Sequence, residues 1–211
     1  MNHRTMNLLA AGRGARADVL PFVRAWLNDP LRVGAALPSG TALASVITAD
    51  ISAATGPVIE LGAGTGAFTR ALLRRGVPED QLVLVESSPE FASLLQARYR
   101  SATVLCEDAA RLGRLKLAFS GQVGAVVSGL PVLSMPRRKV LGVLAGAFRQ
   151  LRPQGAFYQF TYGPKCSVSR SMLEHLDLES RRVGIAWINV PPASVYRIAR
   201  RPEPAAMTLA A

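Results

Sequence analysis

The sequence predicts an α/β fold in which helices cover both faces of a mostly parallel sheet that ends in an antiparallel hairpin. Apolar runs alternate with segments of helical spacing from residue 57 to residue 176, which is typical of parallel strands joined by helices. A glycine-rich loop joins the first apolar run to the first of these helical segments. Two further runs flank Pro191-Pro192 and predict the closing hairpin.

Seven strands and the helices between them follow from this pattern. The expected strands are 57–61, 82–86, 102–106, 123–127, 155–162, 181–190 and 194–200. The expected helices are 66–75, 89–98, 108–118, 137–151 and 169–176. Pro89 suits the first turn of its helix, because proline lacks the N–H that this position leaves unpaired.

Two more helices precede the sheet. Residues 18–29 have helical apolar spacing, and Ser39 is expected to cap a helix that ends near residue 51. The first helix carries Phe22 and Trp26 on one side and Arg24 on the other, so it either lies in a membrane interface or packs on the domain with a solvated basic face. We expect a disordered N-terminus at 1–17, one domain at 18–201 that includes the helices of 18–51, and a flexible tail at 202–211.

Composition restricts the class of protein and its partners. The 211 residues suit a single domain, and no apolar run approaches the roughly 18 residues of a membrane span. The N-terminus lacks the apolar stretch of a signal peptide. Cys106 and Cys166 have no metal-binding or disulfide spacing, which predicts no metal site and fits a reducing cytoplasm. The net charge of +11 predicts attraction to an anionic partner, either nucleic acid or an anionic membrane.

The stretch Val58–Gly66 predicts a nucleotide-binding loop. A β-branched apolar run ends at Glu60, and glycines follow at 62, 64 and 66 before the next helix begins. Glycine permits positive φ angles and close approach of the backbone to a ligand. Glu86 lies 20 positions after Gly66 at the end of the next apolar run, where an acid can bind ribose hydroxyls.

Two cofactor classes fit such a loop. The spacing Gly62-x-Gly64-x-x-Ala67 also satisfies a nicotinamide dinucleotide fingerprint. An acid inside the strand, at Glu60, instead suits the cationic methionine end of S-adenosylmethionine (AdoMet). The spelling resembles motif I of the class I AdoMet-dependent methyltransferases, whose Rossmann-like sheet has seven strands. This resemblance implies cofactor contacts at Glu60, Gly62, Gly64, Thr65, Gly66, Glu86, Ser87, Asp108, Ala109 and Ser128, with S-adenosylhomocysteine as product.

The fourth expected strand ends in Ser128-Gly129-Leu130-Pro131. This turn resembles the amine-orienting loop of the rRNA adenine dimethyltransferases, which leaves an rRNA adenine N6-methyltransferase as an alternative function. Val132 departs from that pattern, because those enzymes carry an aromatic residue there that stacks on the base. They also tend to have a helical RNA-binding domain after the catalytic one, which we do not expect here. Nucleic acid is therefore not the expected partner.

Several stretches together resemble the bacterial phospholipid N-methyltransferases of the rhizobial type. They are Trp26–Gly34, Pro38–Gly40, Ser128–Pro136, Gln159–Pro164 and Asn189–Ala193. The resemblance implies a peripheral enzyme at the cytoplasmic membrane's inner face that methylates phosphatidylethanolamine stepwise toward phosphatidylcholine. It also implies that the helix 18–29, with Phe22, Arg24 and Trp26, contacts the bilayer.

The expected chemistry is attack of a neutral amine on the methyl group. Ser128, Gly129 and Leu130 are expected to orient the amine. Tyr158 and Tyr162 share one face of their strand, where each either faces the methylated cation or packs against a helix. The candidates for the lipid phosphate are Lys165, Arg170 and Arg181, each of which is alternatively a solvated surface charge. Candidates for the base are His175, Tyr162 and a water held by Glu60.

Overall fold

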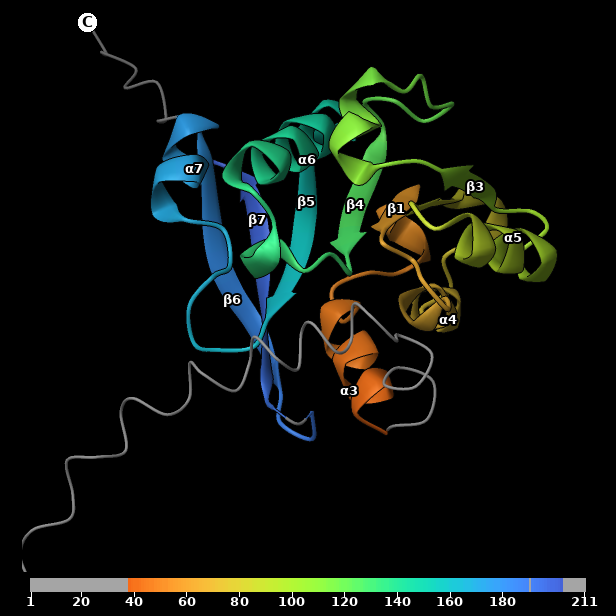
Figure 1. The fold of residues 1–211 in the computed structure, drawn as a ribbon, viewed down its shortest axis with the longest axis horizontal. Helices are drawn as coiled ribbons and strands as arrows, with labels where there is room; N and C mark the ends of the chain where they lie inside the picture. Colours follow the sequence, from red (N-terminus) through yellow and green to blue (C-terminus); the bar gives the residue numbers. More distant parts are fainter. Residues whose placement is uncertain (1–37, 190, 203–211) are drawn as a thin grey trace, which may run out of the picture.

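The computed structural model of the chain describes residues 38–189 and 191–202 (Figure 1). The predicted disorder of residues 1–17, the helix 18–29 with Phe22, Arg24 and Trp26, and the tail from residue 203 lie outside the described residues. Within the described ranges, no helix is long and apolar enough to cross a bilayer.

The described chain forms one seven-stranded sheet with the order β3-β2-β1-β4-β5-β7-β6. The first five strands in this order are parallel, whereas β7 is antiparallel to both of its neighbours. The strands are β1 (Val58–Leu61), β2 (Leu82–Glu86), β3 (Thr103–Cys106), β4 (Val123–Ser128), β5 (Leu151–Thr161), β6 (Leu178–Ala186) and β7 (Ala193–Arg200). The predicted α/β class, with its parallel sheet and closing hairpin, is confirmed.

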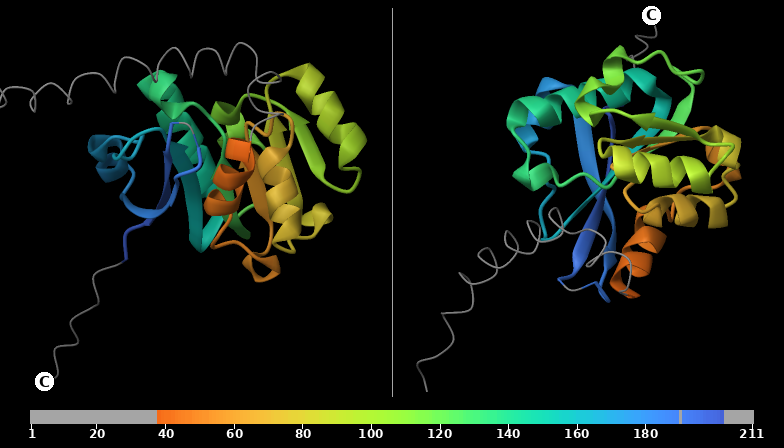
Figure 2. Two further views of the ribbon diagram at one scale, coloured as in Figure 1. Left: turned by 90° about the horizontal axis from the view of Figure 1, so that it is seen from below. Right: turned by 45° about the vertical axis from the view of Figure 1, so that its right-hand side comes forward.

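Helices cover both faces of this sheet (Figure 2). The α-helices are α3 (Pro38–Ile47), α4 (Ala67–Arg74), α5 (Pro89–Arg98), α6 (Arg137–Gln150) and α7 (Arg170–His175). Short 3-10 turns are η1 (Ala53–Thr55), η2 (Glu79–Gln81), η3 (Ala109–Arg114) and η4 (Val132–Ser134). One apolar layer packs α3, α4 and α5 on the sheet, and a second packs η3, α6 and α7 on the opposite face.

Most element boundaries lie within one residue of the sequence prediction, and the larger differences include those in β5, α3 and β6. Strand β5 begins at Leu151, where a helix was expected to end, because Leu151 pairs with Val123 of β4. The register between the two strands shifts just after this pair. Ser39 lies within α3, and that helix ends at Ile47, after which the hydroxyl of Thr48 bonds to the carbonyl of Ala44. Strand β6 runs over 178–186, and residues 187 to 189 belong to the turn that follows.

The expected helix at 108–118 is also shorter, since only the 3-10 turn η3 forms there. Its Gly113 lies directly against Gly146 of α6, and a Cβ added to Gly146 would come within 2.7 Å of the Gly113 nitrogen. Side chains at either position would push the two elements apart. The two glycines therefore allow η3 to lie closely on α6.

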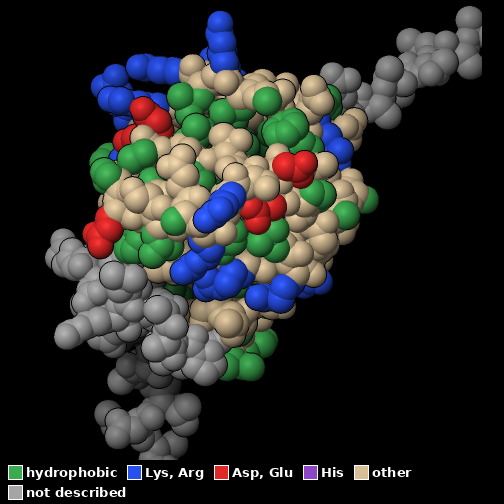
Figure 3. Space-filling model, turned by 90° about the vertical axis from the view of Figure 1, so that its right-hand side faces the viewer, with side chains coloured by type: hydrophobic (Ala, Val, Ile, Leu, Met, Phe, Trp, Pro, Cys, Tyr) green, Lys and Arg blue, Asp and Glu red, His purple; other side chains and the backbone are tan. Residues whose placement is uncertain are grey.

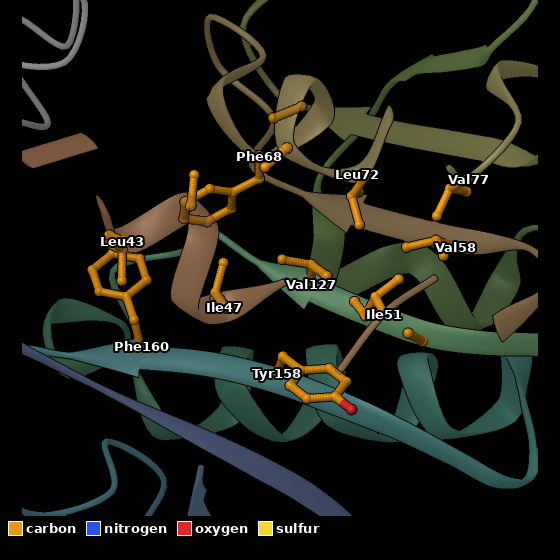
Figure 4. Close-up of a cluster of buried hydrophobic side chains, with 14 of the residues drawn as sticks. Leu43, Ile47, Ile51, Val58, Phe68, Leu72, Val77, Val127, Tyr158 and Phe160 are labelled. Atoms are coloured by element: carbon orange, nitrogen blue, oxygen red, sulfur yellow. The ribbon is translucent and has the colours of Figure 1, made fainter. Parts of the chain in front are cut away.

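The layer beneath α3 and α4 fixes the position of the strand ends. Ile47, Leu72 and Val127 are fully buried in it, and Figure 4 shows them with the ring of Tyr158 on β5. Burial of side chains of this size stabilises the fold by about 1.5–3 kcal/mol each.

The strand order reverses between β1 and β4, which lie side by side at the centre of the sheet. In open α/β sheets this reversal opens a crevice beyond the carboxyl ends of the strands, where ligands bind. The glycine loop leaves β1 and the Ser-Gly-Leu-Pro turn leaves β4 at this point. The fold thus brings together the two motifs that the sequence singled out.

Candidate active site at the β1–β4 reversal

The loop after β1 uses its glycines for two different reasons. Gly62, Gly64 and Gly66 all have positive φ angles, of 69°, 51° and 79°, which cost other residues about 1–2 kcal/mol each. At Gly66 a Cβ would also lie 2.9 Å from the hydroxyl oxygen of Tyr99. A Cβ on Gly64 would meet no atom within 4 Å, so the loop backbone faces open space there.

Glu86, at the end of β2, holds this loop in place. Its Oε2 accepts a hydrogen bond from the Gly64 N–H at 2.9 Å, and its Oε1 accepts one from the Ser88 N–H at 2.9 Å. Glu86 is 8% exposed, whereas Ser87 beside it is exposed. Glu86 therefore fixes the loop and borders the same open space.

Glu60 is buried within β1, at 1% exposure. Burial is the main reason that the pKa of its carboxyl rises to about 8, against smaller opposing effects of the Thr69 hydrogen bond and the Arg70 charge. Thr69 on α4 donates that bond at 2.6 Å. Glu60 thus ties the first turns of α4 to the central strand.

Asp108 follows β3 and is bonded on two sides. It caps η3 by accepting a hydrogen bond from the Ala110 N–H at 3.0 Å, and it lies 2.9 Å from the ammonium group of Lys139 on α6. Partial burial works against ionisation, but the bonds from Lys139 and Ala110 hold the pKa of Asp108 below its usual value. The side chain of Ala109 is buried, so this residue can offer a ligand only its backbone.

The turn after β4 lies against the glycine loop. The Gly129 N–H donates to the carbonyl of Leu61 at 2.8 Å, and a Cβ on Gly129 would lie 2.8 Å from the carbonyl oxygen of Gly62. Only glycine fits this approach without displacing the backbone. The hydroxyl of Ser128, which is fully buried, accepts a hydrogen bond from the Leu130 N–H at 3.3 Å.

Gln159 of β5 supports the turn from the neighbouring strand. Its Nε2 donates to the carbonyls of Leu130, at 3.0 Å, and Phe160, at 2.9 Å. The Leu130 carbonyl also accepts from the Val132 N–H at 2.9 Å. By contrast, none of the described residues donates a hydrogen bond to the carbonyl of Gly129, which leaves it available as an acceptor.

A largely apolar pocket adjoins the turn, and its volume of about 380 Å³ includes open solvent. Its lining residues are Leu130, Pro131, Val132, Leu133, Phe160, Thr161, Tyr162 and Ser167. The rings of Phe160 and Tyr162 meet edge to face at 5.5 Å. The Tyr162 hydroxyl is hydrogen-bonded to the side chain of Asn189, and burial raises its pKa.

Three of the predicted substrate residues are not among those that line this pocket. Tyr158 shares a sheet face with Tyr162, as predicted, but it is buried in the core near Asp50 and Arg197 (Figure 4). Lys165 is exposed in the loop before α7. Arg170 is an exposed residue paired with Glu174 at 2.8 Å.

Basic side chains gather on the face over α4 and α5 (Figure 3). Arg70 and Arg98, both exposed, each donate a hydrogen bond to the carbonyl of Thr65 at 3.0 Å. This predicted cofactor residue is therefore held through its backbone by two guanidinium groups. The contacts add positive charge beside the glycine loop.

The structure adds site residues that the sequence interpretation missed, namely Thr69, Lys139, Gln159, Phe160 and Asn189. Phe160 had a usable signal, since it alternates with Tyr158 and Tyr162 on one strand face. Lys139 and Gln159 are 31 and 29 residues from the groups they contact, and no local pattern indicates such pairs.

Comparison with known proteins yields one family match and partial relatives. Residues 58–155 match a family described as a methyltransferase domain. An ornithine lipid N-methyltransferase of Singulisphaera acidiphila is 35% identical over 111 residues, covering 51% of this chain and 58% of that protein. Ribosomal RNA small subunit methyltransferase A of a Hydrogenobaculum species is 44% identical over 52 residues, covering 25% of this chain and 20% of that protein. The chain thus spans less than two thirds of either relative.

Solved structures share the fold. A TehB-like SAM-dependent methyltransferase of Corynebacterium glutamicum has a TM-score of 0.58 at 14% identity, covering 88% of this chain and 100% of its own. A 1,6-didemethyltoxoflavin N1-methyltransferase of Burkholderia thailandensis, solved with S-adenosylhomocysteine, has a TM-score of 0.58 at 15% identity; the match covers 93% of this chain and 94% of that one. The glycopeptide N-methyltransferase MtfA, solved with AdoMet, has a TM-score of 0.59 at 15% identity; the match covers 77% of this chain and 95% of that one.

We predict that Glu60 makes the protein less stable as the pH rises. In the unfolded state the Glu60 carboxyl group loses its proton above its ordinary pKa of 4.5. In the folded state it keeps this proton until the pH passes its raised pKa of about 8. The free energy of unfolding should therefore fall between these values, by at most about 1.4 kcal/mol per pH unit. Glu60→Gln cannot titrate and should lack this slope.

Urea unfolding of both proteins at several pH values checks this. The free energy of wild type minus that of Glu60→Gln should be lower at the alkaline end by about 2–4 kcal/mol, and the subtraction cancels the other titrating groups. Parallel stability curves would show that Glu60 is ionised in the folded protein.

Proposed function

We propose, from the premise that this chain has the class I methyltransferase fold, that it transfers methyl groups from AdoMet to the primary amine of a lipid headgroup. The first substrate we assign is phosphatidylethanolamine, followed by its mono- and dimethyl derivatives toward phosphatidylcholine. The observation that carries the proposal is the β4 turn. It places the Gly129 carbonyl, to which none of the described residues donates, between the glycine loop and an apolar pocket.

The residues at the β1–β4 reversal fit AdoMet. The Gly64 backbone borders open space, and the carboxyl groups of Glu60 and Glu86 lie around the loop. Bound AdoMet would supply an electrophilic methyl group. Glu86 would bind its ribose hydroxyls, and Glu60 would lie near its cationic end, where positive charge favours ionisation of the carboxyl. The methyltransferase-domain match and the neighbours solved with AdoMet or S-adenosylhomocysteine support this cofactor over a nicotinamide.

The turn offers one acceptor to an amine. The Leu130 carbonyl already accepts two hydrogen bonds, and the buried Ser128 hydroxyl accepts one from the Leu130 N–H, which leaves the Gly129 carbonyl. This carbonyl is rigidly held, because the turn is bonded to β1 on one side and to Gln159 on the other. Held acceptors orient the lone pair of a neutral amine along the line of attack, and such positioning supplies much of the rate.

The pocket beside the turn suits a methylated amine attached to a lipid. Its walls are largely apolar, and its Phe160–Tyr162 pair presents ring surface to an ammonium group whose charge becomes harder to solvate with each methyl. The similarity to an ornithine lipid N-methyltransferase supports an aminolipid substrate. We therefore also propose that the protein works at the inner face of the cytoplasmic membrane.

An rRNA adenine methyltransferase is the second candidate. It is favoured by the short match to the ribosomal RNA enzyme and by the net charge of +11. Against it, Val132 is 7% exposed and supplies no aromatic ring at the position where that resemblance needs a base-stacking residue.

We predict that Gln159→Met lowers turnover more than it lowers stability. Methionine keeps the length of the side chain but removes both donors, so the Leu130 carbonyl loses one partner and the turn loosens. The kcat should fall by about tenfold or more with little change in the KM for AdoMet, while the free energy of unfolding falls by about 1–3 kcal/mol. Equal kcat at a temperature where both proteins are folded would contradict a positioning role.

We predict that Glu86→Ala weakens AdoMet binding by about tenfold or more, because a hydrogen bond to a charged group contributes about 1.5–3 kcal/mol. Isothermal titration calorimetry measures the affinity, and circular dichroism checks the fold. Glu90→Ala, which removes an exposed carboxyl group from the first turn of α5, is the matched control. Unchanged affinity in Glu86→Ala would remove Glu86 from the cofactor site.

The proposed function is tested by offering the protein tritiated AdoMet with phosphatidylethanolamine vesicles, ornithine-lipid vesicles or ribosomal RNA. We expect label in phosphatidylethanolamine, with a rate that high salt reduces by screening the attraction to anionic lipid. Label confined to ornithine lipid would keep the enzyme class and change the substrate. Label in RNA alone would overturn the proposal in favour of the second candidate.

A further inference from the structure

Two large apolar side chains protrude at the end of the β6–β7 hairpin. Trp187 is 73% exposed and Ile188 is 72% exposed. Across the described part of the chain, Leu133 at 58% is the other large hydrophobic side chain with comparable exposure. The other large apolar side chains of the described residues are buried or partly buried, so the hairpin end is unusually apolar for this surface.

The hairpin end lies at the same edge of the sheet as the pocket. Strand β6 runs in the same direction as β5, since both are antiparallel to β7, so their carboxyl ends lie at one edge (Figure 1). Asn189, the next residue after Ile188, has its side chain bonded to the hydroxyl of Tyr162 in the pocket wall. Leu133 lines the pocket itself. The exposed apolar residues are thus tied to the pocket.

Positive charge lies behind this apolar end. Arg181 and Arg182 on β6 and Lys165 in the neighbouring loop are all exposed. At about 3.4 Å per residue, Arg182 lies at most roughly 17 Å from Trp187, the first residue after the strand. A headgroup layer is about 7 Å thick and the Debye length is about 8 Å, and together they are close to this distance. With Trp187 at the hydrocarbon boundary, the arginines would act on anionic phosphates.

We infer that the turn Trp187–Asn189 is a membrane-inserting tip that holds the pocket mouth against an anionic lipid bilayer. Tryptophan suits the boundary between headgroups and hydrocarbon, because its ring is apolar and its N–H remains close to water. Isoleucine beside it adds apolar surface without polar groups. Insertion of this turn presents the pocket to lipid headgroups. The inference rests on the proposed function for the identity of the lipid substrate, whereas the insertion itself is measured without catalysis.

Insertion is tested on the full chain with Trp26→Phe, which leaves Trp187 as the remaining tryptophan of the two in the sequence. Vesicles of phosphatidylglycerol and phosphatidylethanolamine should shift its emission to the blue, and lipids brominated near the headgroup should quench it. An emission spectrum that vesicles leave unchanged would overturn the inference. A blue shift that needs only higher protein concentration, without vesicles, would also overturn it, because a second copy would then cover the tip.

The contribution of the tip is measured by vesicle co-sedimentation of two double variants. Trp187→Ser with Ile188→Ser should bind at least about tenfold more weakly than the parent, since interfacial binding scales with buried apolar area. The matched control, Trp187→Phe with Ile188→Val, keeps the apolar surface and should bind nearly as well as the parent. Equal binding of vesicles by both double variants would overturn the inference. The same would follow if the serine variant, assayed also with RNA, lost RNA binding and kept vesicle binding.

Methyl transfer separates this inference from the proposed function. With a short-chain phosphatidylethanolamine below its micelle concentration, both double variants should match the parent, whereas with vesicles the serine variant alone should be slow. A serine variant that is equally slow on both forms would overturn the inference, because its defect would then lie in the site. If no form methylates any lipid while the tip still inserts, the proposed function fails and the inference stands.

Discussion

The approach of two backbones at the centre of the sheet is the constraint on which the site depends. Gly129 donates its N–H to Leu61 and leaves no room for a Cβ beside the carbonyl of Gly62. This contact exists because β1 and β4 are neighbours where the strand order reverses. It sets the glycine loop and the turn after β4 at a fixed separation, so that under the proposed function a cofactor held by the loop would face a substrate held by the turn.

Two buried acids serve this contact differently. Glu86 accepts from two backbone N–H groups and can border a ligand, whereas Glu60 is withdrawn into β1 and bonded to Thr69. Burial raises the pKa of Glu60 despite the charge of Arg70, so ionisation of this carboxyl group is unfavourable. The fold therefore keeps a carboxyl group beside the loop whose ionisation a positively charged ligand would favour.

The sequence predicted the sheet well because strand–loop–helix units are encoded locally. Apolar runs, glycines and caps lie within a few residues of one another, and β2 and α5 began and ended where expected. Boundaries failed where distant contacts decide them. Strand β5 starts at Leu151 because it pairs with Val123, and η3 stays short where Gly113 lies on Gly146. Such pairings are invisible to a local pattern.

The sequence by itself determined the elements of the candidate site: the glycine loop, the acids Glu60, Glu86 and Asp108 at or next to three strand ends, and the turn after β4. Only the tertiary structure decided their use. It paired Asp108 with Lys139, and it placed Gln159 where its side chain donates to the Leu130 carbonyl. It also buried Tyr158, whereas Tyr162 lines the pocket. The physical reason is that hydrogen bonds and burial belong to pairs of residues, and partners far apart in the chain are chosen by packing.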